Sequence, residues 1–239
     1  MDYSSYLNEF MDEIYDEFIS ENAGGMKAPD MFTLYAMLKD INPDVVIESG
    51  LWKGQCTKVI RGAVGEECKI ICLEPRTLYG WQDDGNTDYY IGEKFIDFES
   101  LNLSEYKDDK VVAIFDDHIN KVKRLFESKS KNVDWSIFCN NYPKNCGSHL
   151  TLEHIYKQDM RYINQYRNPD DLITKTKELI EEYKVYPNIF PGKIKTGEGI
   201  FDCESYFKEP VEDKDIIEKY KPLYEEKESY RWNTLVKLK

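Results

Sequence analysis

Acidic, histidine and amide side chains follow two apolar runs of the chain, where they could bind a metal ion or accept a proton. They are Asp116, Asp117 and His118 after Val111–Phe115, and Asn140 and Asn141 after the run at 132–139. Ionisable groups at the end of a buried strand are hard to explain by packing, because burying them without a partner is costly. Carboxylate and amide oxygens are the ligands that a hard divalent cation such as magnesium prefers. The pattern therefore predicts either a metal site or a metal-free site in which His118 is the general base.

A glycine-containing turn lies earlier in the chain, in Asp-Val-Val-Ile-Glu-Ser-Gly-Leu-Trp-Lys-Gly-Gln-Cys-Thr at 44–57. The β-branched run 45–47 predicts a buried strand, and the spacing from Gly54 to Val64 is compatible with a helix. A strand, a glycine-rich turn and a helix place a nucleotide-like ligand at the strand's C-terminal end. The dinucleotide fingerprint G-x-G-x-x-G is not matched, because only Gly50 and Gly54 are present.

A second strand is predicted at Lys69–Leu73, and it ends at Glu74 and Pro75. Glu74 lies 24 residues beyond Gly50. An acid in this position accepts hydrogen bonds from ribose hydroxyls in nucleotide-binding α/β folds. The alternative is an ordinary solvated glutamate at a strand end.

The remaining pattern supplies the elements that must position these residues. Helices are expected at 3–19, with a broad apolar stripe, and at 30–39, 150–166 and 169–186. Further strands are expected at 95–98, 111–115, 132–139 and 230–238, and the segments 79–92 and 187–199 are expected to be irregular. Strands alternating with helices predict an α/β fold with a largely parallel sheet.

These motifs together resemble class I S-adenosylmethionine (SAM) methyltransferases, in particular the catechol O-methyltransferase-like enzymes. The SAM loop of that group reads Glu-x-Gly-x-x-x-Gly-x-Ser/Thr, and 48–57 follows it with Cys56 in place of Ser. Metal-dependent members carry Asp-His after one strand and Asp-Asn after the next, and sugar O-methyltransferases use a related carboxylate arrangement. Asn140 departs from this pattern because an amide replaces a carboxylate, and Asp116 is an extra acid that compensates only if it turns inward. The resemblance covers residues 28–143.

The resemblance implies a fold, a function and a set of site residues. The fold would be Rossmann-like and doubly wound, with a mainly parallel seven-stranded sheet, an antiparallel C-terminal strand and a helical insertion. The function would be transfer of a methyl group from SAM to a hydroxyl of a small molecule or sugar, with or without a divalent metal. SAM would be bound by Glu48, Gly50, Lys53, Gly54, Thr57, Glu74, Asp97 and Asp116. Catalysis would use Asp116, Asp117 and His118, and magnesium would be bound by Asp117, Asn140 and Asn141.

Two other functions stay open at this point. One is that of a cephalosporin hydroxylase-like protein of the same fold. The other is a non-catalytic protein that binds a nucleotide-like ligand or a partner chain, which the amide at Asn140 favours.

Length and composition set the outer limits. We expect one domain over residues 1–239, with N-terminal helices in 1–40 and a cap or insertion in 144–210. A net charge of −13 argues against a nucleic-acid partner, and a mean hydropathy of −0.64 argues against a membrane span. Six scattered cysteines without a C-x-x-C pair favour reduced thiols and a cytoplasmic protein. The apolar stripe of the first helix is a candidate surface for a homo-oligomer.

Overall fold

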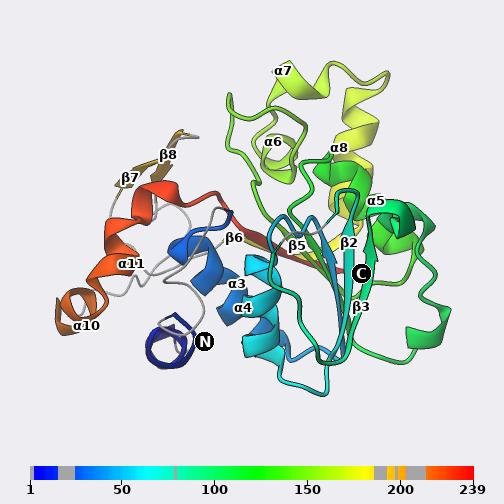
Figure 1. Cartoon of the computed structure of the whole chain (residues 1–239). Helices are drawn as coiled ribbons and strands as arrows, with labels where there is room; N and C mark the ends of the chain where they lie inside the picture. Colours follow the sequence, from blue (N-terminus) through cyan, green and yellow to red (C-terminus); the bar gives the residue numbers. More distant parts are fainter. Residues whose placement is uncertain (1–2, 16–24, 78–79, 186–192, 197–198, 203–213) are drawn as a thin grey trace.

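A seven-stranded sheet forms the centre of the fold in the computed structural model, which describes residues 3–15, 25–77, 80–185, 193–196, 199–202 and 214–239. The strands are β1 Val45–Ser49, β2 Lys69–Glu74, β3 Thr87–Ile91, β4 Val111–Phe115, β5 Trp135–Phe138, β6 Ile180–Val185 and β9 Thr234–Leu238. Their order across the sheet is β3-β2-β1-β4-β5-β9-β6 (Figure 1). Strands β1 to β5 are parallel, whereas β9 runs antiparallel to both of its neighbours. This confirms the predicted α/β fold, the seven-stranded sheet and its antiparallel C-terminal strand.

Strands β1 and β4 lie in the middle of the sheet, and every residue in them is buried. Parallel strands covered on both faces read as continuous apolar runs, which is why both were visible in the sequence. The two runs pair in register, with Val45 opposite Val111 and Ser49 opposite Phe115. The residues that follow β1 and β4 therefore emerge side by side at one edge of the sheet.

Helices cover both faces of the sheet (Figure 1). One face carries α3 Ala28–Ile41 and α4 Gln55–Val64, with α1 Tyr3–Glu9 and a π-helical turn at Phe10–Tyr15 packed outside them. The other face carries α5 Lys121–Ser130, α6 Leu152–Tyr156, α7 Met160–Ile163 and α8 Pro169–Glu178. The short helices α10 Lys214–Lys219 and α11 Lys221–Glu225 and a hairpin of β7 Lys193–Thr196 and β8 Gly199–Asp202 lie beside the α3 face.

The apolar stripe of the N-terminal helix is buried within the chain. Phe10 is fully buried, and its ring centroid lies 5.6 Å from that of Phe32 and 5.4 Å from that of Tyr35, both on α3. Leu7 and Ile14 belong to the same hydrophobic cluster. The predicted helix is confirmed over 3–15, and residues 16–19 lie outside the described part of the chain. The apolar stripe therefore packs within the chain, and these contacts do not support the predicted homo-oligomer. That association stays a prediction.

Two predicted elements are wrong. The candidate strand at 95–98 is a connection that ends in a short 3-10 turn at Phe98–Ser100, and the strand at this edge is β3, inside the segment expected to be a loop. The helix expected over 169–186 stops at Glu178, and the chain then forms β6. Both strands flank the sheet and expose part of their side chains, so neither has the apolar run that marks β1 and β4.

The predicted helix at 150–166 is divided into α6 and α7. Residues 180–185, which fall inside the expected insertion at 144–210, are part of the central sheet. Across the described residues, no helix is long and apolar enough to cross a membrane.

Candidate active site

A cavity of about 570 Å³ opens at the C-terminal ends of the parallel strands. Its wall takes residues from the ends of β1, β2, β4 and β5, from the start of α3 and from the segment before β9. Those that matter below are Asp30, Gly50, Glu74, Arg76, Asp97, Asp116, His118, Asn140, Arg231 and Asn233. Polar groups from separate strands thus meet at one edge of the sheet, as expected for a ligand site in an α/β fold.

Two glycines of the turn after β1 make room for other parts of the backbone. Gly50 has φ +97°, and a Cβ there would lie 2.8 Å from the carbonyl group of Asp116. Gly54 has φ +79°, and a Cβ there would lie 2.1 Å from the carbonyl oxygen of Trp81. Gly50 also lines the cavity, whereas Gly54 does not. Both glycines are therefore required by the close approach of another backbone segment, and only Gly50 could also contact a ligand in the cavity.

Glu74 lies at the end of β2 with 1% of its surface exposed. Its Oε2 accepts hydrogen bonds from the backbone amides of Leu51 and Trp52, each at 3.2 Å, and its Oε1 accepts one from Arg76 Nε at 2.7 Å. Burial opposes ionisation, but these hydrogen bonds outweigh it and hold the pKa of Glu74 below its usual value. The Arg76 side chain is 60% exposed and stacks 4.6 Å from the Trp52 ring centroid. Glu74 is thus ionised, anchored to the turn after β1 and covered by a cation.

Glu48 is fully buried behind the turn. Its Oε2 accepts a hydrogen bond from Thr57 Oγ1 at 2.7 Å, and its Oε1 has no partner among the described residues. Burial raises the pKa of Glu48 to about 7. Glu48, Lys53, Gly54 and Thr57 do not line the cavity, so the structure separates these predicted cofactor residues from Gly50 and Glu74, which do.

Asp117 is engaged by cations and donors on every side. Its Oδ2 accepts hydrogen bonds from Ser49 Oγ at 2.9 Å and Arg124 Nε at 2.8 Å, and its Oδ1 accepts one from the amide of Ile119 at 3.1 Å. Lys121 Nζ lies 3.7 Å from the same Oδ1. Arg124 and Lys121 are 1% and 0% exposed, so Asp117 is the counter-ion of two buried cations.

Asp97 is held by the other side of Arg124. Its two oxygens accept hydrogen bonds from Arg124 NH1 and NH2 at 2.8 and 3.0 Å, which lower its pKa to about 2. Asp97, Glu99 and Glu127 are close enough to suggest a cation site. Arg124 and Lys123 already form ion pairs with these carboxylates, so the cluster is explained without a metal.

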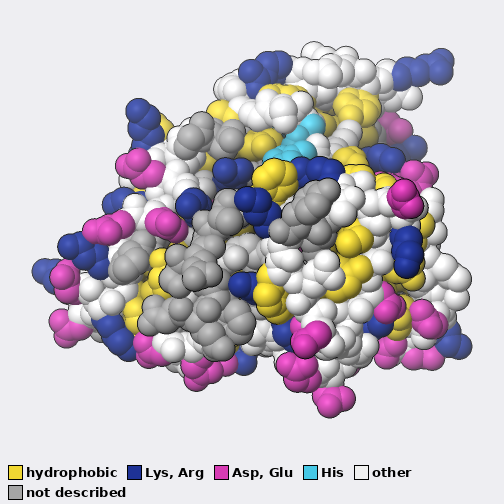
Figure 2. Space-filling view, in the orientation of Figure 1, with side chains coloured by type: hydrophobic (Ala, Val, Ile, Leu, Met, Phe, Trp, Pro, Cys, Tyr) yellow, Lys and Arg dark blue, Asp and Glu magenta, His cyan; other side chains and the backbone are white. Residues whose placement is uncertain are grey.

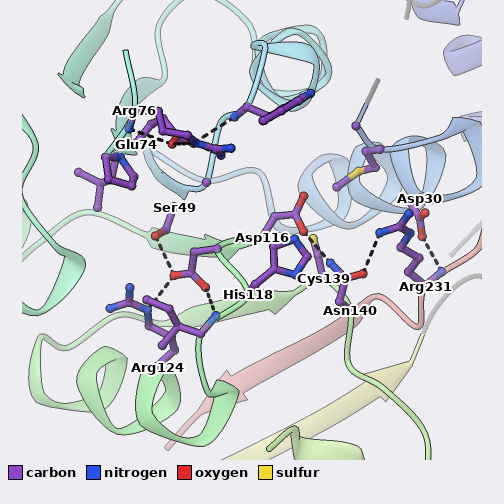
Figure 3. Close-up of a pocket in the computed structure, with 18 of the residues that line it drawn as sticks. Asp30, Ser49, Glu74, Arg76, Asp116, His118, Arg124, Cys139, Asn140 and Arg231 are labelled. Carbon is purple, nitrogen blue, oxygen red and sulfur yellow. Dashed lines mark hydrogen bonds and ion pairs between the residues drawn. The ribbon is translucent and has the colours of Figure 1, made fainter. Parts of the chain in front are cut away.

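Asp116 is the acid after β4 that faces the cavity. Its Oδ1 accepts a hydrogen bond from Asn140 Nδ2 at 2.7 Å. Burial raises its pKa, although the positive charges of Lys121, His118 and Arg231 oppose that rise. His118 adopts φ +56° and is exposed at the cavity rim. In Figure 3, Asn140, Arg231 and Asp30 lie beyond Asp116 and His118, on the side away from Ser49 and Arg124.

Asn141 points away from the cavity and is fully buried. Its Nδ2 donates to Tyr183 and Thr234 at 2.8 and 2.7 Å, and its Oδ1 accepts from the amide of Glu153 at 3.0 Å. It therefore ties the end of β5 to β6, β9 and α6. Asp117, Asn140 and Asn141 do not direct free oxygens to one point, so this arrangement of the three does not fit a magnesium ion.

The cavity residues that were not singled out from the sequence include Asp30, Arg76, Arg124, Cys139, Arg231 and Asn233. Asp30 lies in the first turn of helix α3 and is 2% exposed, and Asn233 is 1% exposed. Asp30 Oδ1 accepts a hydrogen bond from the amide of Arg231 at 3.0 Å, across 201 residues of chain. An acid in the first turn of a helix is ordinary, so no local signal distinguished Asp30.

The charge pattern of this face differs from that of the whole chain. Several Lys and Arg side chains lie next to the cyan of the histidines, and others lie at the upper and left edges of the view, whereas Asp and Glu lie mostly toward its periphery (Figure 2). The net charge of −13 is therefore not spread evenly over the surface.

No protein-family model and no curated protein sequence matches the chain. Similar solved structures include the apo form of CmcI-N160, at 14% identity and a TM-score of 0.44, covering 67% of this chain and 64% of that one. The present chain thus spans less than two thirds of that protein. Another is the O-methyltransferase TomG from Streptomyces achromogenes in complex with SAM, at 9% identity and a TM-score of 0.43, covering 99% of this chain and 88% of that one. A third is an O-methyltransferase from Bacillus cereus in complex with SAH, at 9% identity and a TM-score of 0.41, covering 98% and 90%. At such identity, chemistry has to be argued from the chain's own residues.

Proposed function

We propose that this protein is a SAM-dependent methyltransferase that methylates a hydroxyl group of a small molecule or sugar. The observation that carries the proposal is the cavity, which joins Gly50 after β1, Glu74 at the end of β2 and Asp116 after β4. Its volume of about 570 Å³ lies within the range of roughly 300–1,000 Å³ of small-molecule sites. Among the similar structures, TomG and the Bacillus cereus protein are O-methyltransferases.

The cofactor half of the cavity would extend from Gly50 to Glu74. An ionised acid at the end of the second strand suits the hydroxyls of a ribose. Arg76 now covers that carboxylate, and its exposed, stacked side chain can move aside or pack on the bound ligand. Glu48 and Thr57 would act from behind the turn, by holding its shape. When bound, SAM would supply the methyl group for an in-line displacement by the acceptor oxygen.

The acceptor half would lie over β4 and β5. Asp116 is the best placed group to take the hydroxyl proton, because one of its oxygens is fixed by Asn140 and the other has no hydrogen-bond donor among the described residues. Asp117 is unsuited to this role, since both of its oxygens already accept hydrogen bonds, Oδ2 from Ser49 and Arg124 and Oδ1 from the amide of Ile119. His118, at the rim, would pass the proton to solvent. Positioning of the two reactants would supply most of the rate enhancement.

A divalent metal is not part of the proposed mechanism. One similar structure, that of CmcI-D160, is a complex with magnesium and SAM, so the test below includes magnesium. Here the oxygens of Asp117 and Asn141 are already bonded inside the protein. The proposed methyl transfer therefore includes no metal-bound step.

Calorimetric titration with SAM and with S-adenosylhomocysteine (SAH) tests the proposal. We expect micromolar binding of both, with equal affinity in EDTA and in magnesium. Absence of binding at millimolar ligand would overturn the methyltransferase assignment. Binding that requires magnesium would overturn the metal-free part alone.

A further inference from the structure

The end of the cavity away from Glu74 is built from parts of the chain that are distant in sequence. Asp30 comes from the start of α3, Asp116 from the end of β4, and Arg231 and Asn233 from the segment before β9. Asn233 Nδ2 donates to the carbonyl oxygen of Asp30 at 3.2 Å, and the amide of Arg231 donates to Asp30 Oδ1 at 3.0 Å. These contacts fix the Asp30 side chain in the wall of the cavity.

Three oxygens at this end lack a hydrogen-bond donor within the described residues. Asp30 Oδ2 and Asp116 Oδ2 receive none, because the bonds to these side chains end on Oδ1 in both cases. Asn233 Oδ1 is buried without a partner. Of the three, Asn233 Oδ1 is the buried atom, and a buried polar atom without a partner costs about 1–3 kcal/mol, so it is usually satisfied in the functional state.

The two carboxylates also lack an ion pair. Asp30 is 2% exposed, and no described cation lies within ion-pair distance of it or of Asp116. The guanidinium of Arg231, which lines this end, donates to Asn140 Oδ1 at 3.4 Å. Asp30 is the buried one of the two, whereas Asp116 is partly exposed. A buried carboxylate is normally paired, because removing a charge from water costs several kcal/mol. Burial raises the pKa of Asp30 to about 8, and a cation bound beside it would favour its ionised form. Arg231 thus brings one positive charge to two carboxylates, so this end of the cavity carries a surplus of negative charge and of hydrogen-bond acceptors.

We propose that the inner end of the cavity binds a protonated amine of the acceptor substrate, with Asp30 as its counter-ion. An ammonium group carries one positive charge and three N–H donors. Asp30 Oδ2 and Asn233 Oδ1 supply acceptors for two of these donors, and Asp116 Oδ2 stays free for the acceptor hydroxyl. A hydroxyl offers one donor and no charge, so it leaves the carboxylates unpaired. The acceptor is thus assigned to the amino alcohols or amino sugars, with the amine at Asp30 and the hydroxyl at Asp116; this assignment rests on the proposed function.

The test is a pair of small probes of equal shape. Ethanolamine carries the ammonium and ethylene glycol replaces it with a hydroxyl; both are titrated into ¹⁵N-labelled full-length protein saturated with SAH. We expect millimolar binding of ethanolamine, at least tenfold weaker binding of ethylene glycol, and a shift of the Arg231 amide signal, since that amide bonds to Asp30 Oδ1. Equal binding of the two probes, or ethanolamine binding that leaves the Arg231 amide unmoved, would overturn the proposal.

Two variants test whether the charge of Asp30 is responsible for the preference for ethanolamine. Asp30→Asn keeps the shape and removes the charge, and we expect it to weaken ethanolamine at least tenfold while leaving ethylene glycol unchanged. Asp108→Asn, at a side chain that is 88% exposed, is the matched control and should change neither. If Asp30→Asn does not fold, the probe pair and the Arg231 signal in the wild-type protein decide alone.

The amine of the cofactor's own methionine group is the other source of an ammonium ion. SAH and its desamino analogue separate the two sources. A loss of SAH affinity in Asp30→Asn that the desamino analogue does not show would place the cofactor's amine at Asp30 and overturn the acceptor assignment. Failure of SAH to bind the wild-type protein would instead refute the methyltransferase function; ethanolamine is then titrated without SAH, and its preference over ethylene glycol decides whether the ammonium site stands.

Discussion

Glu74 is the residue on which cofactor binding should depend most. Replacing it by Ala removes the acceptor for ribose hydroxyls and frees the Leu51 and Trp52 amides. We expect SAH binding to weaken by about 1–3 kcal/mol, the cost of leaving such groups unpaired. Calorimetry measures this directly, with Glu93→Ala as a control at an exposed acid near the end of β3. If SAH binds Glu74→Ala with unchanged affinity, the ribose does not bind at the end of β2.

Asp117 separates a structural role from a metal-binding one. Its removal leaves Lys121, which is 0% exposed, without an ion pair among the described residues, and takes one of three carboxylates from Arg124. Breaking a buried ion pair in this way costs about 3–5 kcal/mol, so Asp117→Ala should unfold at clearly lower denaturant concentration. Asp108→Ala, at an exposed ion pair, should change stability by less than about 1 kcal/mol. A variant with full stability but no methyl transfer would show that Asp117 serves the reaction directly.

Glu48 should make stability depend on pH. Burial raises its folded pKa to about 7, from a usual value of 4.5. Below pH 4.5 the carboxyl is protonated in both states and contributes nothing; as pH rises from 4.5 to 7 the folded state retains a proton that the unfolded state loses, so stability falls. Above about pH 7 the loss is constant, on the order of a few kcal/mol.

Glu48→Gln removes this loss while keeping the shape of the side chain. The stability difference between variant and wild type should be near zero at pH 4.5 and should favour the variant at pH 8. Denaturant unfolding at both pH values measures it, and Glu67→Gln, at an exposed acid, should show no such trend. A variant that is less stable than wild type at pH 8 would indicate an unrecognised partner for the ionised carboxylate.

The turn between β1 and α4 connects sequence to site. Gly54→Ala places a methyl group 2.1 Å from the carbonyl oxygen of Trp81, in backbone with φ +79°. Gly65, at the other end of α4, has φ +73° and nothing within 4 Å of an added Cβ. Both substitutions incur the strain of positive φ, about 1–3 kcal/mol, and only Gly54→Ala adds a backbone clash. Thermal unfolding should therefore place Gly54→Ala well below Gly65→Ala, and equal melting temperatures would contradict the close approach of the Trp81 segment.

The elements that the sequence predicted well are those whose environment is uniform. β1 and β4 are buried on both faces, so their apolar runs were unambiguous. β3 and β6 lie at the edges of the sheet, and the exposed positions of β6 carry charged residues that also suit a helix. Their existence is decided by pairing with β2 and β9, which no local pattern records.

The candidate site follows the same division. Glu74, Asp116 and Asn140 were predicted because a parallel sheet brings the ends of its strands together. The partners of these residues were not, since Arg124 and Lys121 reach Asp117 from helix α5 by side-chain direction alone. Asp30 and Arg231 lie 201 residues apart and meet only in the folded chain. Position along a strand could be predicted, whereas the electrostatic state of each acid could not.

The C-terminal segment contributes both to the central sheet and to the acceptor half of the cavity. β9 lies between β5 and β6, and Tyr230 and Trp232 just before it are buried in the cluster that contains α3. Arg231 and Asn233 are placed in the cavity wall by the same segment. Ligands that fill the cavity therefore contact several parts of the sheet edge at once, and binding should stabilise the molecule as a unit.

SAH should raise the melting temperature in proportion to its occupancy. A ligand at 100 times its dissociation constant stabilises the folded state by about 2.7 kcal/mol. For a chain of this size, each kcal/mol corresponds to roughly 2–4 °C, so we expect a rise of roughly 5–10 °C. Glu74→Ala at the same SAH concentration should show a clearly smaller rise, because occupancy falls with affinity. A scan in which SAH leaves the wild-type melting temperature unchanged, while calorimetry detects binding, would show that the ligand also binds the unfolded chain or a site outside the cavity.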